Sequence, residues 1–364
     1  MFSKYSKTMP TNIEFKKIFE DLIDTLIREE GSDLHLATGR FPVIRINGEL
    51  ITLMNRSALT QEDMQGIIEA VLSPEHHKRF LDTQELDFSY EYQGTVRLRG
   101  NVFVQQSKYT MVLRLIPHVK TLQELNLPPI LADFARRKQG FFLVVGPVGQ
   151  GKSATMSSMV GLINEERAAH ILTIEDPVEY MYDAKKSIID QREVGIDTEN
   201  FETGLKGAFR QDVNVILIGE MRSPETISAA VTAAETGHLV LSTLHTNNAS
   251  QTIDRIIDSF PAAQQDQVRI QLASSLIGIF SQRLIPRVTG GRVPAYELLI
   301  NNAAVANLIR ERRTHEIDMV IETGFEQGMI DMNRSLIELV RTGEITIENA
   351  YAYSLNPKNL ERLL

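Results

Sequence analysis

One eight-residue stretch constrains the fold of this 364-residue chain more than any other feature. Residues 146–153 read Gly-Pro-Val-Gly-Gln-Gly-Lys-Ser, which matches the pattern G-x-x-x-x-G-K-[ST] of a phosphate-binding loop. The glycines let the backbone curl so that several N–H groups point at phosphate oxygens, and the following helix adds the positive end of its dipole. The apolar run 141–145 precedes the motif, as a strand should. The stretch therefore predicts a nucleotide-binding α/β domain.

The motif gives a role to its polar side chains. We expect the Lys152 ammonium to reach the β and γ phosphate oxygens of a nucleotide, and the Ser153 hydroxyl to bind Mg²⁺. The predicted cofactors are therefore ATP and Mg²⁺. The residues predicted to contact the nucleotide are Gly146, Gly149, Gln150, Gly151, Lys152, Ser153 and Ala154.

Short apolar runs indicate a sheet that is covered on both faces. The runs are 141–145, 171–174, 215–218 and 239–244. They are continuous rather than alternating, as expected for buried parallel strands, and helical segments separate them. One such helix is predicted to begin at Ser223-Pro224 and to end at Gly237. These patterns predict a doubly wound α/β core.

The segment before the loop has the pattern of a small α+β domain. Apolar residues recur with helical spacing over residues 13–30, which predicts an amphipathic helix that ends at Gly31. Alternating residues followed by Asn47-Gly48 predict a β-hairpin, and residues 95–116 predict a second hairpin that turns near Ser107.

These patterns also predict the domain boundaries. They are a loose tail over residues 1–12, the small domain over 13–117, a proline-bracketed linker over 118–135, the α/β core over 136–300 and a helical C-terminal segment over 301–364.

Acidic residues at two strand ends can complete the nucleotide site. Ligands of doubly wound sheets sit at the carboxyl ends of the strands, so acids there should face the phosphate-binding loop. We assign Glu220, which follows the run 215–218, to the magnesium ion, and Glu175, which follows the run 171–174, to activation of the attacking water. Glu179 is the fallback base. Glu175, Asp176 and Glu179 also fit the alternative that they are solvated loop residues, and Glu179 fits an interface residue.

Two histidines flank the run 239–244. His245 lies at its carboxyl end, where the γ-phosphate is expected, and is interpreted as a phosphate sensor or as an ordinary hydrogen-bonded histidine. His238 lies at the other end, roughly 23 Å away at the rise of a strand, so the two histidines cannot share a zinc ion.

Arginines could supply the positive charge that a phosphoryl-transfer transition state requires. Arg97, Arg99 and Arg114 lie in the predicted second hairpin, and Arg255 lies in the predicted α/β domain. Exposed arginines of this kind usually form a solvated face, but ring ATPases often take such cations from another domain or subunit.

Composition excludes several classes of protein. The net charge of −9 disfavours duplex nucleic acid as a partner. The absence of cysteine excludes disulfides and thiolate metal sites and fits a reducing cytoplasm. The longest apolar runs are far shorter than the ~18 residues of a membrane span, and the first residues lack the apolar core of a secretory signal. We therefore predict a cytoplasmic protein that reaches a membrane only through a partner.

Taken together, the motifs resemble those of the secretion and pilus ATPases. The resemblance rests on the phosphate-binding loop, the acidic segment 174–179, Gly219–Arg222 and the histidine segment 236–246. Residues 31–36 and 191–195 resemble the PilT-like retraction branch, which drives type IV pili. The assembly and secretion branch usually carries a further N-terminal domain and a four-cysteine zinc module, so the sequence favours the retraction branch.

The resemblance implies a fold and a set of roles. The implied fold is a PAS-like N-terminal domain followed by a RecA-like ATPase domain with a helical C-terminal extension, assembled as a homohexamer with ATP between the domains. By motif position, Glu175 matches the catalytic glutamate, Glu220 the Walker B acid and His245 the phosphate-sensing histidine. Arg99 and Arg114 match arginines that a neighbouring subunit supplies.

The resemblance also implies a function and partners. It implies an ATPase, peripheral at the inner membrane, that powers pilus retraction and twitching motility through an inner-membrane platform protein. A paralogous retraction ATPase is a further expected partner, and nucleic acid is not.

Some residues depart from the family pattern and keep alternatives open. Ala154 replaces the threonine that usually follows the loop serine, Gln150 replaces a small residue, Val213 replaces proline and Ala306 replaces an arginine. Nucleotide binding is expected to tolerate these changes, whereas the rate of hydrolysis and its coupling to retraction stay open. The alternatives are a pilus-assembly or type II secretion ATPase, a nucleic-acid translocase, and a non-hydrolysing ring subunit that binds nucleotide and assists a paralogous motor.

Overall fold

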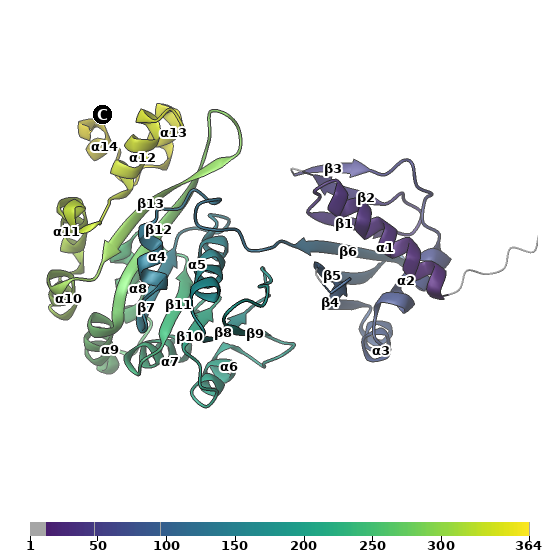
Figure 1. Ribbon diagram of the computed structural model, residues 1–364, viewed down its shortest axis with the longest axis horizontal. Helices are drawn as coiled ribbons and strands as arrows, with labels where there is room; N and C mark the ends of the chain where they lie inside the picture. The colour runs from purple at the N-terminus through teal and green to yellow at the C-terminus, as the bar shows by residue number, and fades with distance from the viewer. Residues whose placement is uncertain (1–11, 47, 95, 364) are drawn as a thin grey trace, which may run out of the picture. The chain divides into compact units, whose positions relative to one another are not determined.

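The chain forms two compact units, one up to Pro117 and one from His118. The computed structural model describes residues 12–46, 48–94 and 96–363 (Figure 1). Of the predicted tail over residues 1–12, all but Asn12 lies outside these ranges. In the described part of the chain, no helix is both long enough and apolar enough to cross a bilayer.

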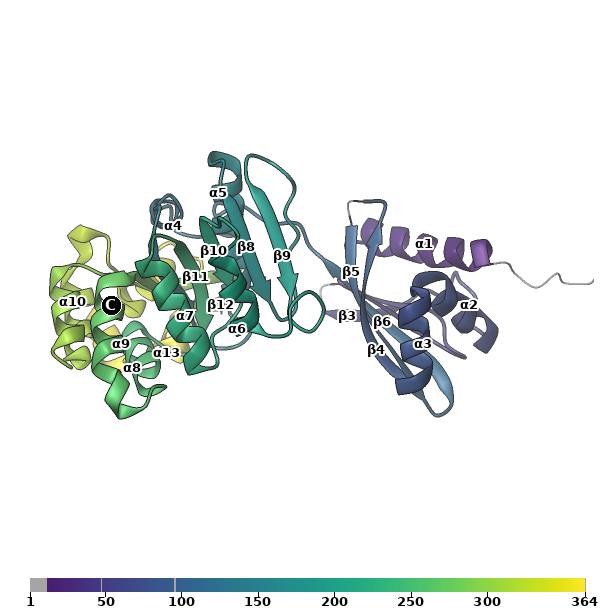
Figure 2. The ribbon, with the colours of Figure 1, turned by 90° about the horizontal axis from the view of Figure 1, so that it is seen from below.

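The first unit packs helices against one face of an antiparallel sheet (Figure 2). The sheet order is β3-β2-β1-β6-β5-β4. The strands are β1 (Asp33–Ala37), β2 (Val43–Ile46), β3 (Glu49–Thr52), β4 (Glu85–Tyr92), β5 (Val96–Gln105) and β6 (Lys108–Ile116), and the helices are α1 (Asn12–Arg28), α2 (Gln61–Val71) and α3 (Pro74–Thr83). The core contains large buried side chains from both layers, such as Phe19, Ile23, Leu34 and Leu98.

The two predicted hairpins are present in this unit. The Asn47-Gly48 pair lies between β2 and β3, which pair with Ile46 opposite Glu49, although Asn47 itself lies outside the described residues. The turn between β5 and β6 is formed by Gln106 and Ser107, which both have positive φ, as a two-residue hairpin turn with the right twist requires. The strand β4 was not predicted.

The second unit is an α/β domain built on a mixed sheet with the order β13-β12-β7-β11-β10-β8-β9. The strands are β7 (Gly140–Val145), β8 (His170–Glu175), β9 (Ile188–Glu193), β10 (Val215–Ile218), β11 (Leu239–Leu244), β12 (Leu276–Pro286) and β13 (Arg292–Ile300). All neighbouring pairs are parallel except β12 and β13. The predicted buried strands are therefore confirmed as β7, β8, β10 and β11.

Helices cover both faces of this sheet, as the continuous apolar runs predict. The helices are α4 (Ile130–Ala135), α5 (Lys152–Glu166), α6 (Phe201–Ala208), α7 (Pro224–Glu235), α8 (Ala249–Asp258), α9 (Ala262–Ser275), α10 (Ala303–Arg310), α11 (Ile317–Thr323), α12 (Met332–Arg341), α13 (Ile347–Tyr353) and α14 (Pro357–Leu363). Phe141, Leu143 and Val145 pack on the side of α6–α11, whereas Phe142 and Val144 pack on the side of α4 and α5. This alternation shows that β7 is buried on both faces.

Three features of the second unit differ from the sequence-based expectation. β9, β12 and β13 were not predicted; β12 was missed because polar residues interrupt its apolar pattern at Ser281-Gln282-Arg283. The end of the predicted helical segment 301–364 is divided into α13 and α14, because Asn356 and Pro357 start a new helix at α14. Small 3₁₀ turns, Thr314–Glu316 and Phe325–Gln327, lie among the other C-terminal helices.

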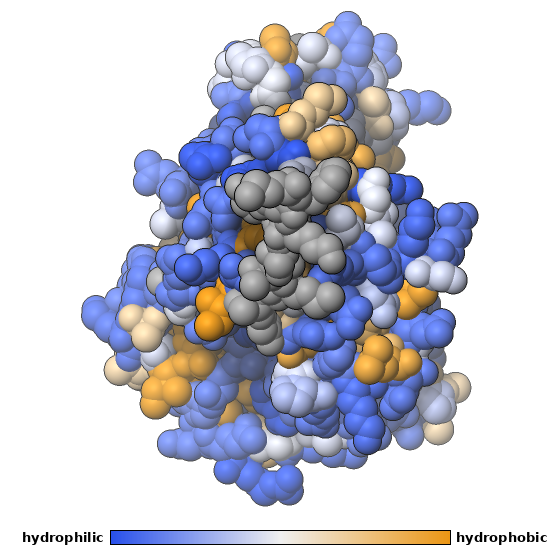
Figure 3. Space-filling view, turned by 90° about the vertical axis from the view of Figure 1, so that its right-hand side faces the viewer, coloured by the Kyte–Doolittle hydropathy of each residue, from blue (hydrophilic) through white to orange (hydrophobic). Residues whose placement is uncertain are grey.

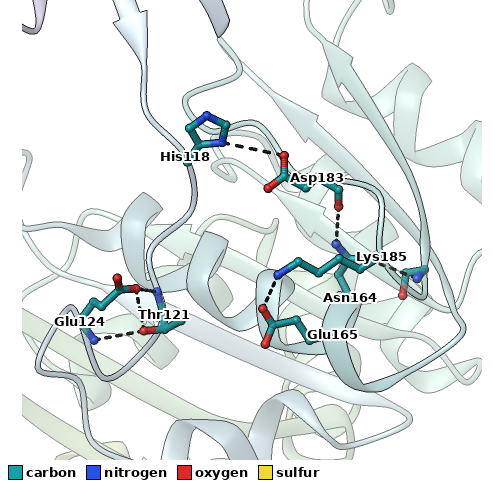
Figure 4. Close-up of polar contacts among 8 residues, drawn as sticks. His118, Thr121, Glu124, Asn164, Glu165, Asp183 and Lys185 are labelled. Carbon is teal, nitrogen blue, oxygen red and sulfur yellow. Dashed lines mark hydrogen bonds and ion pairs between the residues drawn. The ribbon is translucent and has the colours of Figure 1, made fainter. Parts of the chain in front are cut away.

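The segment predicted as a linker, residues 118–135, belongs to the second unit. Polar contacts connect the start of this segment to the rest of the second unit (Figure 4). His118 Nδ1 lies 3.9 Å from an Asp183 carboxylate oxygen, and the side-chain amide of Asn164 in α5 donates to the Asp183 carbonyl at 2.8 Å. Thr121 and Glu124 form a capped turn within the segment, since the Thr121 N–H donates to the Glu124 carboxylate at 2.7 Å. The segment then enters α4.

A buried carboxyl joins β13 to the start of α8. The Glu297 Oε1 atom accepts a hydrogen bond from the Ala249 N–H at 2.8 Å. Burial raises the pKa of Glu297 to about 8, more than the nearby Arg283 guanidinium can offset. The folded protein therefore holds a proton at this carboxyl that the unfolded chain releases near pH 4.5.

We predict that Glu297→Gln removes a pH-dependent loss of stability. Between these two pKa values the folded state binds one more proton than the unfolded state, so stability falls as pH rises. Glutamine keeps an oxygen that can accept from Ala249 but does not titrate. The unfolding free energy of the wild type, relative to the variant, should fall by about 1.4 kcal/mol per pH unit from pH ~5 to pH ~8. Urea unfolding of both proteins across this range measures the difference, and parallel profiles would contradict it.

Candidate functional site

The phosphate-binding loop joins β7 to α5 and requires its glycines for two different reasons. Gly146 has a φ of 144°, and a Cβ atom there would lie 2.5 Å from the Gln282 carbonyl oxygen. Gly149 has a φ of 77° but open space around a Cβ, so its requirement is the left-handed backbone alone. The loop curls tightly because one glycine permits close approach and the other permits the turn.

Lys152 is the cation at the centre of this curl. Its Nζ donates to the Gly146 carbonyl and the Pro147 carbonyl, both at 2.8 Å, and lies 3.2 Å from His245 Nδ1. Burial lowers the pKa of Lys152 to about 8, although Glu179 and Glu220 act in the opposite direction. The side chain is thus held where a phosphate would replace the carbonyls as its partner.

The acids predicted for the site lie with the loop around one small cavity. This cavity, of about 60 Å³, lies where β8 and β10 end. Its lining includes Ser153, Glu175, Asp176, Glu179 and Glu220. The parallel strands therefore bring together the predicted metal ligands, the predicted base Glu175 and the fallback base Glu179.

Glu175 is the most enclosed of these acids. Thr173 Oγ1 donates to its Oε1 at 2.7 Å, and Gln191 Nε2 lies 3.5 Å from the same oxygen. Burial raises the pKa of Glu175, and the hydrogen bonds from Thr173 and Gln191 only partly oppose it. These contacts fix one carboxylate oxygen in place.

Glu220 is connected to the loop through His245. The Glu220 carboxylate pairs with Arg222, and its other oxygen lies 3.7 Å from His245 Nε2. Since Lys152 donates to Nδ1, a neutral imidazole with its proton on Nε2 satisfies both contacts. Burial and the Lys152 charge lower the pKa of His245, which favours this neutral form. His245 therefore bridges the loop lysine and the β10 acid.

Oxygen ligands for a magnesium ion are present in this cavity. Hydroxyl and carboxylate oxygens, as on Ser153 and Glu220, are the ligands that Mg²⁺ prefers. Within the described ranges, no group of three or more His, Asp or Glu side chains could hold a metal ion. Mg²⁺ in nucleotide sites usually keeps several waters and takes further ligands from the phosphates.

The remaining candidates lie away from this cavity. His238 Nδ1 lies 2.9 Å from the Ala233 carbonyl at the opposite end of β11, the contact of a structural histidine. Arg255 is exposed on α8. A second, larger cavity of about 1260 Å³ lies between residues 119–136, α5 and α12, and none of the predicted site residues lines it.

The predicted arginines belong to the first unit. Arg99 and Arg114 face each other across β5 and β6. The Arg114 Nε donates to Asp33 Oδ1 at 2.8 Å, and Arg45 Nε lies 3.6 Å from the other oxygen of this buried carboxylate. The Arg97 guanidinium reaches Ser89 Oγ at 3.4 Å. Arg114 is thus exposed but oriented.

Sequence reasoning missed the residues that hold the loop from the side. Gln150 was predicted to contact the nucleotide, but its contact with β12 was not predicted: its Oε1 accepts from the Leu284 N–H at 2.7 Å. Gln282 of the same strand contacts the loop as well. The available signal was the polar group Ser281-Gln282-Arg283 inside an otherwise apolar run.

The chain is similar to known proteins along most of its length. The family model "Type II/IV secretion system protein" matches residues 13–351. The type IV pilus retraction ATPase PilT of Pseudomonas aeruginosa is 41% identical over 93% of this chain and 98% of its own length. The type IV pilus ATPase PilU of the same organism is 38% identical over 95% of this chain and 91% of its own length. A crystal structure of the pilus retraction motor PilT with bound ADP superimposes with a TM-score of 0.88 and 45% identity, covering 94% of this chain and 98% of that one.

Proposed function

Because this chain belongs to the type II/IV secretion system protein family, we propose that it is an ATP-hydrolysing motor that retracts type IV pili. One observation carries the proposal: Ser153 of the phosphate-binding loop shares a single cavity with Glu175 and Glu220. Lys152 adjoins Ser153 and contacts His245, which in turn contacts Glu220. The similarity to a retraction motor along nearly its whole length supports retraction as the work performed.

The finer architecture is part of this proposal. The first unit is a PAS-like domain and the second a RecA-like domain with a helical extension. Six copies form a ring, and ATP lies between the two kinds of domain. The chain works in the cytoplasm, peripheral at the inner membrane, where it turns a platform protein so that filament subunits return to the membrane. Nucleic acid has no part in this cycle.

The loop and α5 bind the nucleotide phosphates. Main-chain N–H groups of the phosphate-binding loop donate to phosphate oxygens, the α5 dipole adds positive potential, and Lys152 exchanges its loop carbonyls for β and γ oxygens. Ser153 and Glu220 would hold Mg²⁺, which would supply positive charge to the phosphates when bound.

Glu175 orients the water that attacks the γ-phosphorus. Thr173 holds one oxygen of the carboxylate, so the carboxylate is fixed before the water arrives. Burial raises the pKa of Glu175 toward the range in which a carboxylate accepts a proton effectively at neutral pH. His245 senses the γ-phosphate, since it already contacts Lys152 and Glu220.

Arg99 and Arg114 of a neighbouring copy neutralise the charge that develops on the transferred phosphoryl group. Asp33 orients Arg114 through Nε, which leaves its Nη groups to face an anion. ATP draws such a domain against the core, and hydrolysis releases it, which converts chemistry into movement.

A second candidate function has one specific observation in its favour. The chain is almost as similar to the type IV pilus ATPase PilU, whose name does not specify retraction, as it is to PilT. This similarity leaves a second role in the same machinery open, that of a ring subunit that assists a paralogous motor. Steady-state ATP hydrolysis by the purified protein alone separates an independent motor from a non-hydrolysing subunit.

We predict that Glu175→Gln abolishes turnover but keeps nucleotide binding. Glutamine has the same shape but cannot accept the proton from water, so kcat should fall by about 10²-fold or more while the Kd for ATP changes only a few-fold. Glu179→Gln, which changes another acid of the same cavity, should leave kcat within a few-fold. If the two variants exchange their effects, Glu179 is the base.

We predict that loss of the gene in a piliated host leaves excess surface pili and no twitching. A retraction motor removes filaments, whereas an assembly motor makes them, so the number of surface pili separates the two functions. Wild-type protein should restore twitching and Glu175→Gln should not. Bald cells on deletion would assign the chain to assembly.

We predict that two inactive variants regain activity when they share a ring. In rings co-expressed from Lys152→Ala and Arg114→Ala subunits and purified through two tags, about a quarter of random interfaces combine an intact lysine with an intact arginine of the neighbour. Turnover should therefore appear in mixed rings and be absent from each parent. Mixed rings as inactive as the parents would place the arginine in the same chain as the loop, or outside the site.

A further inference from the structure

The middle of β12 contains buried polar side chains that the mechanism above does not use. β12 lies between β7, which leads into the phosphate-binding loop, and β13 (Figure 1). Ser281 is 1% exposed, Gln282 is 3% and Arg283 is 9%. Buried polar groups are costly unless they have hydrogen-bond partners, so the partners of these residues indicate what the strand holds.

Both polar atoms of the Gln282 side-chain amide form hydrogen bonds at the phosphate-binding loop. Its Nε2 donates to the Gln150 carbonyl at 2.8 Å, and its Oε1 accepts from Thr155 Oγ1 at 2.6 Å. A Cβ on Gly151 would lie 3.0 Å from the same Nε2. The amide therefore holds the last residues of the phosphate-binding loop and the first turn of α5.

Two main-chain groups of β12 also contact the phosphate-binding loop. The Leu284 N–H donates to the Gln150 side chain at 2.7 Å, and the Gln282 carbonyl is the atom that excludes any side chain at Gly146. Both ends of the loop thus rest on two residues of one strand.

The opposite face of β12 holds the segment that follows His245. Ser281 Oγ donates to the Asn247 carbonyl at 2.8 Å, and Arg283 Nη2 donates to Asn247 Oδ1 at 3.0 Å. Side chains alternate between the faces of a strand, so Ser281 and Arg283 point away from Gln282. One strand therefore positions the lysine loop on one face and the histidine segment on the other.

We propose that Gln282 is a positioning residue for the nucleotide phosphates, which fixes the phosphate-binding loop against β12 in its binding conformation. The inference rests on the proposed nucleotide binding at this loop. A loop rich in glycine has many backbone conformations, and ordering them at the moment of binding would weaken affinity. Gln282 orders the loop before the nucleotide binds, while Ser281 and Arg283 position the segment after His245 against the same strand.

The test compares Gln282→Met with Ile279→Val. Methionine is close to glutamine in length and volume but makes neither hydrogen bond. Ile279 is fully buried in the same strand and makes no hydrogen bond with its side chain, so its shortening perturbs packing alone. For each protein we would measure thermal stability, the Kd for Mg·ADP by calorimetry, and kcat and KM for ATP.

Gln282→Met should raise the Kd for ADP and the KM for ATP by about tenfold, with kcat changed less than about threefold. Ile279→Val should lower the melting temperature with the Kd unchanged. If Gln282→Met lowers the melting temperature as Ile279→Val does and leaves the Kd unchanged, Gln282 is only a core residue and the proposal is wrong.

A second pair of variants tests the contact itself. Thr155→Val removes one partner of Gln282 and should raise the Kd for ADP by a smaller factor, even if Gln282→Met does not fold. The double variant should bind ADP no more weakly than Gln282→Met alone, because both changes break the same contact. Fully additive effects would contradict the proposal. If the wild type itself does not bind ADP, the proposed nucleotide function fails before this inference is tested.

Discussion

The parallel order of β8, β10, β11 and β7 is the constraint on which the candidate site depends. Parallel strands end at the same edge of their sheet, so the residues that follow them meet there although they are far apart in sequence. The loop after β7, Glu175 at the end of β8, Glu220 after β10 and His245 after β11 are brought together in this way. If one strand were shifted by a single residue relative to its neighbours, its acidic side chain would point to the other face of the sheet.

Burial at this edge changes the charge state of the groups that meet there. It lowers the pKa of Lys152 and raises that of Glu175, so both groups are less fully charged than in water. Polyphosphate restores the charge of the lysine, because an anion favours the ammonium.

Local sequence patterns predicted the strands that end at the candidate site, but not β12, which holds the loops of the site in place. The apolar runs of β7, β8, β10 and β11 and the phosphate-binding loop are recognisable within a few residues each. β4 alternates between buried and exposed residues and could have been predicted in the same manner. β12 could not, because Ser281, Gln282 and Arg283 are buried by partners over 30 residues away in sequence, in the two loops that they hold. The raised pKa of Glu297 likewise follows from tertiary burial that no local pattern encodes.

The arginines of the first unit show another property that the sequence alone does not reveal, namely how a side chain is oriented. A sequence shows that Arg114 alternates with apolar neighbours on a strand, which is also true of any solvated residue. The structure adds Asp33, a buried carboxylate that accepts a hydrogen bond from Arg114 Nε, and the Arg114 side chain is 72% exposed. The desolvation of that carboxylate is offset by hydrogen bonds from Ser32 and Arg114, which together hold its pKa below the ordinary value. An aspartate that stays charged in this setting holds the guanidinium plane in one direction, so less side-chain entropy is lost when an anion arrives.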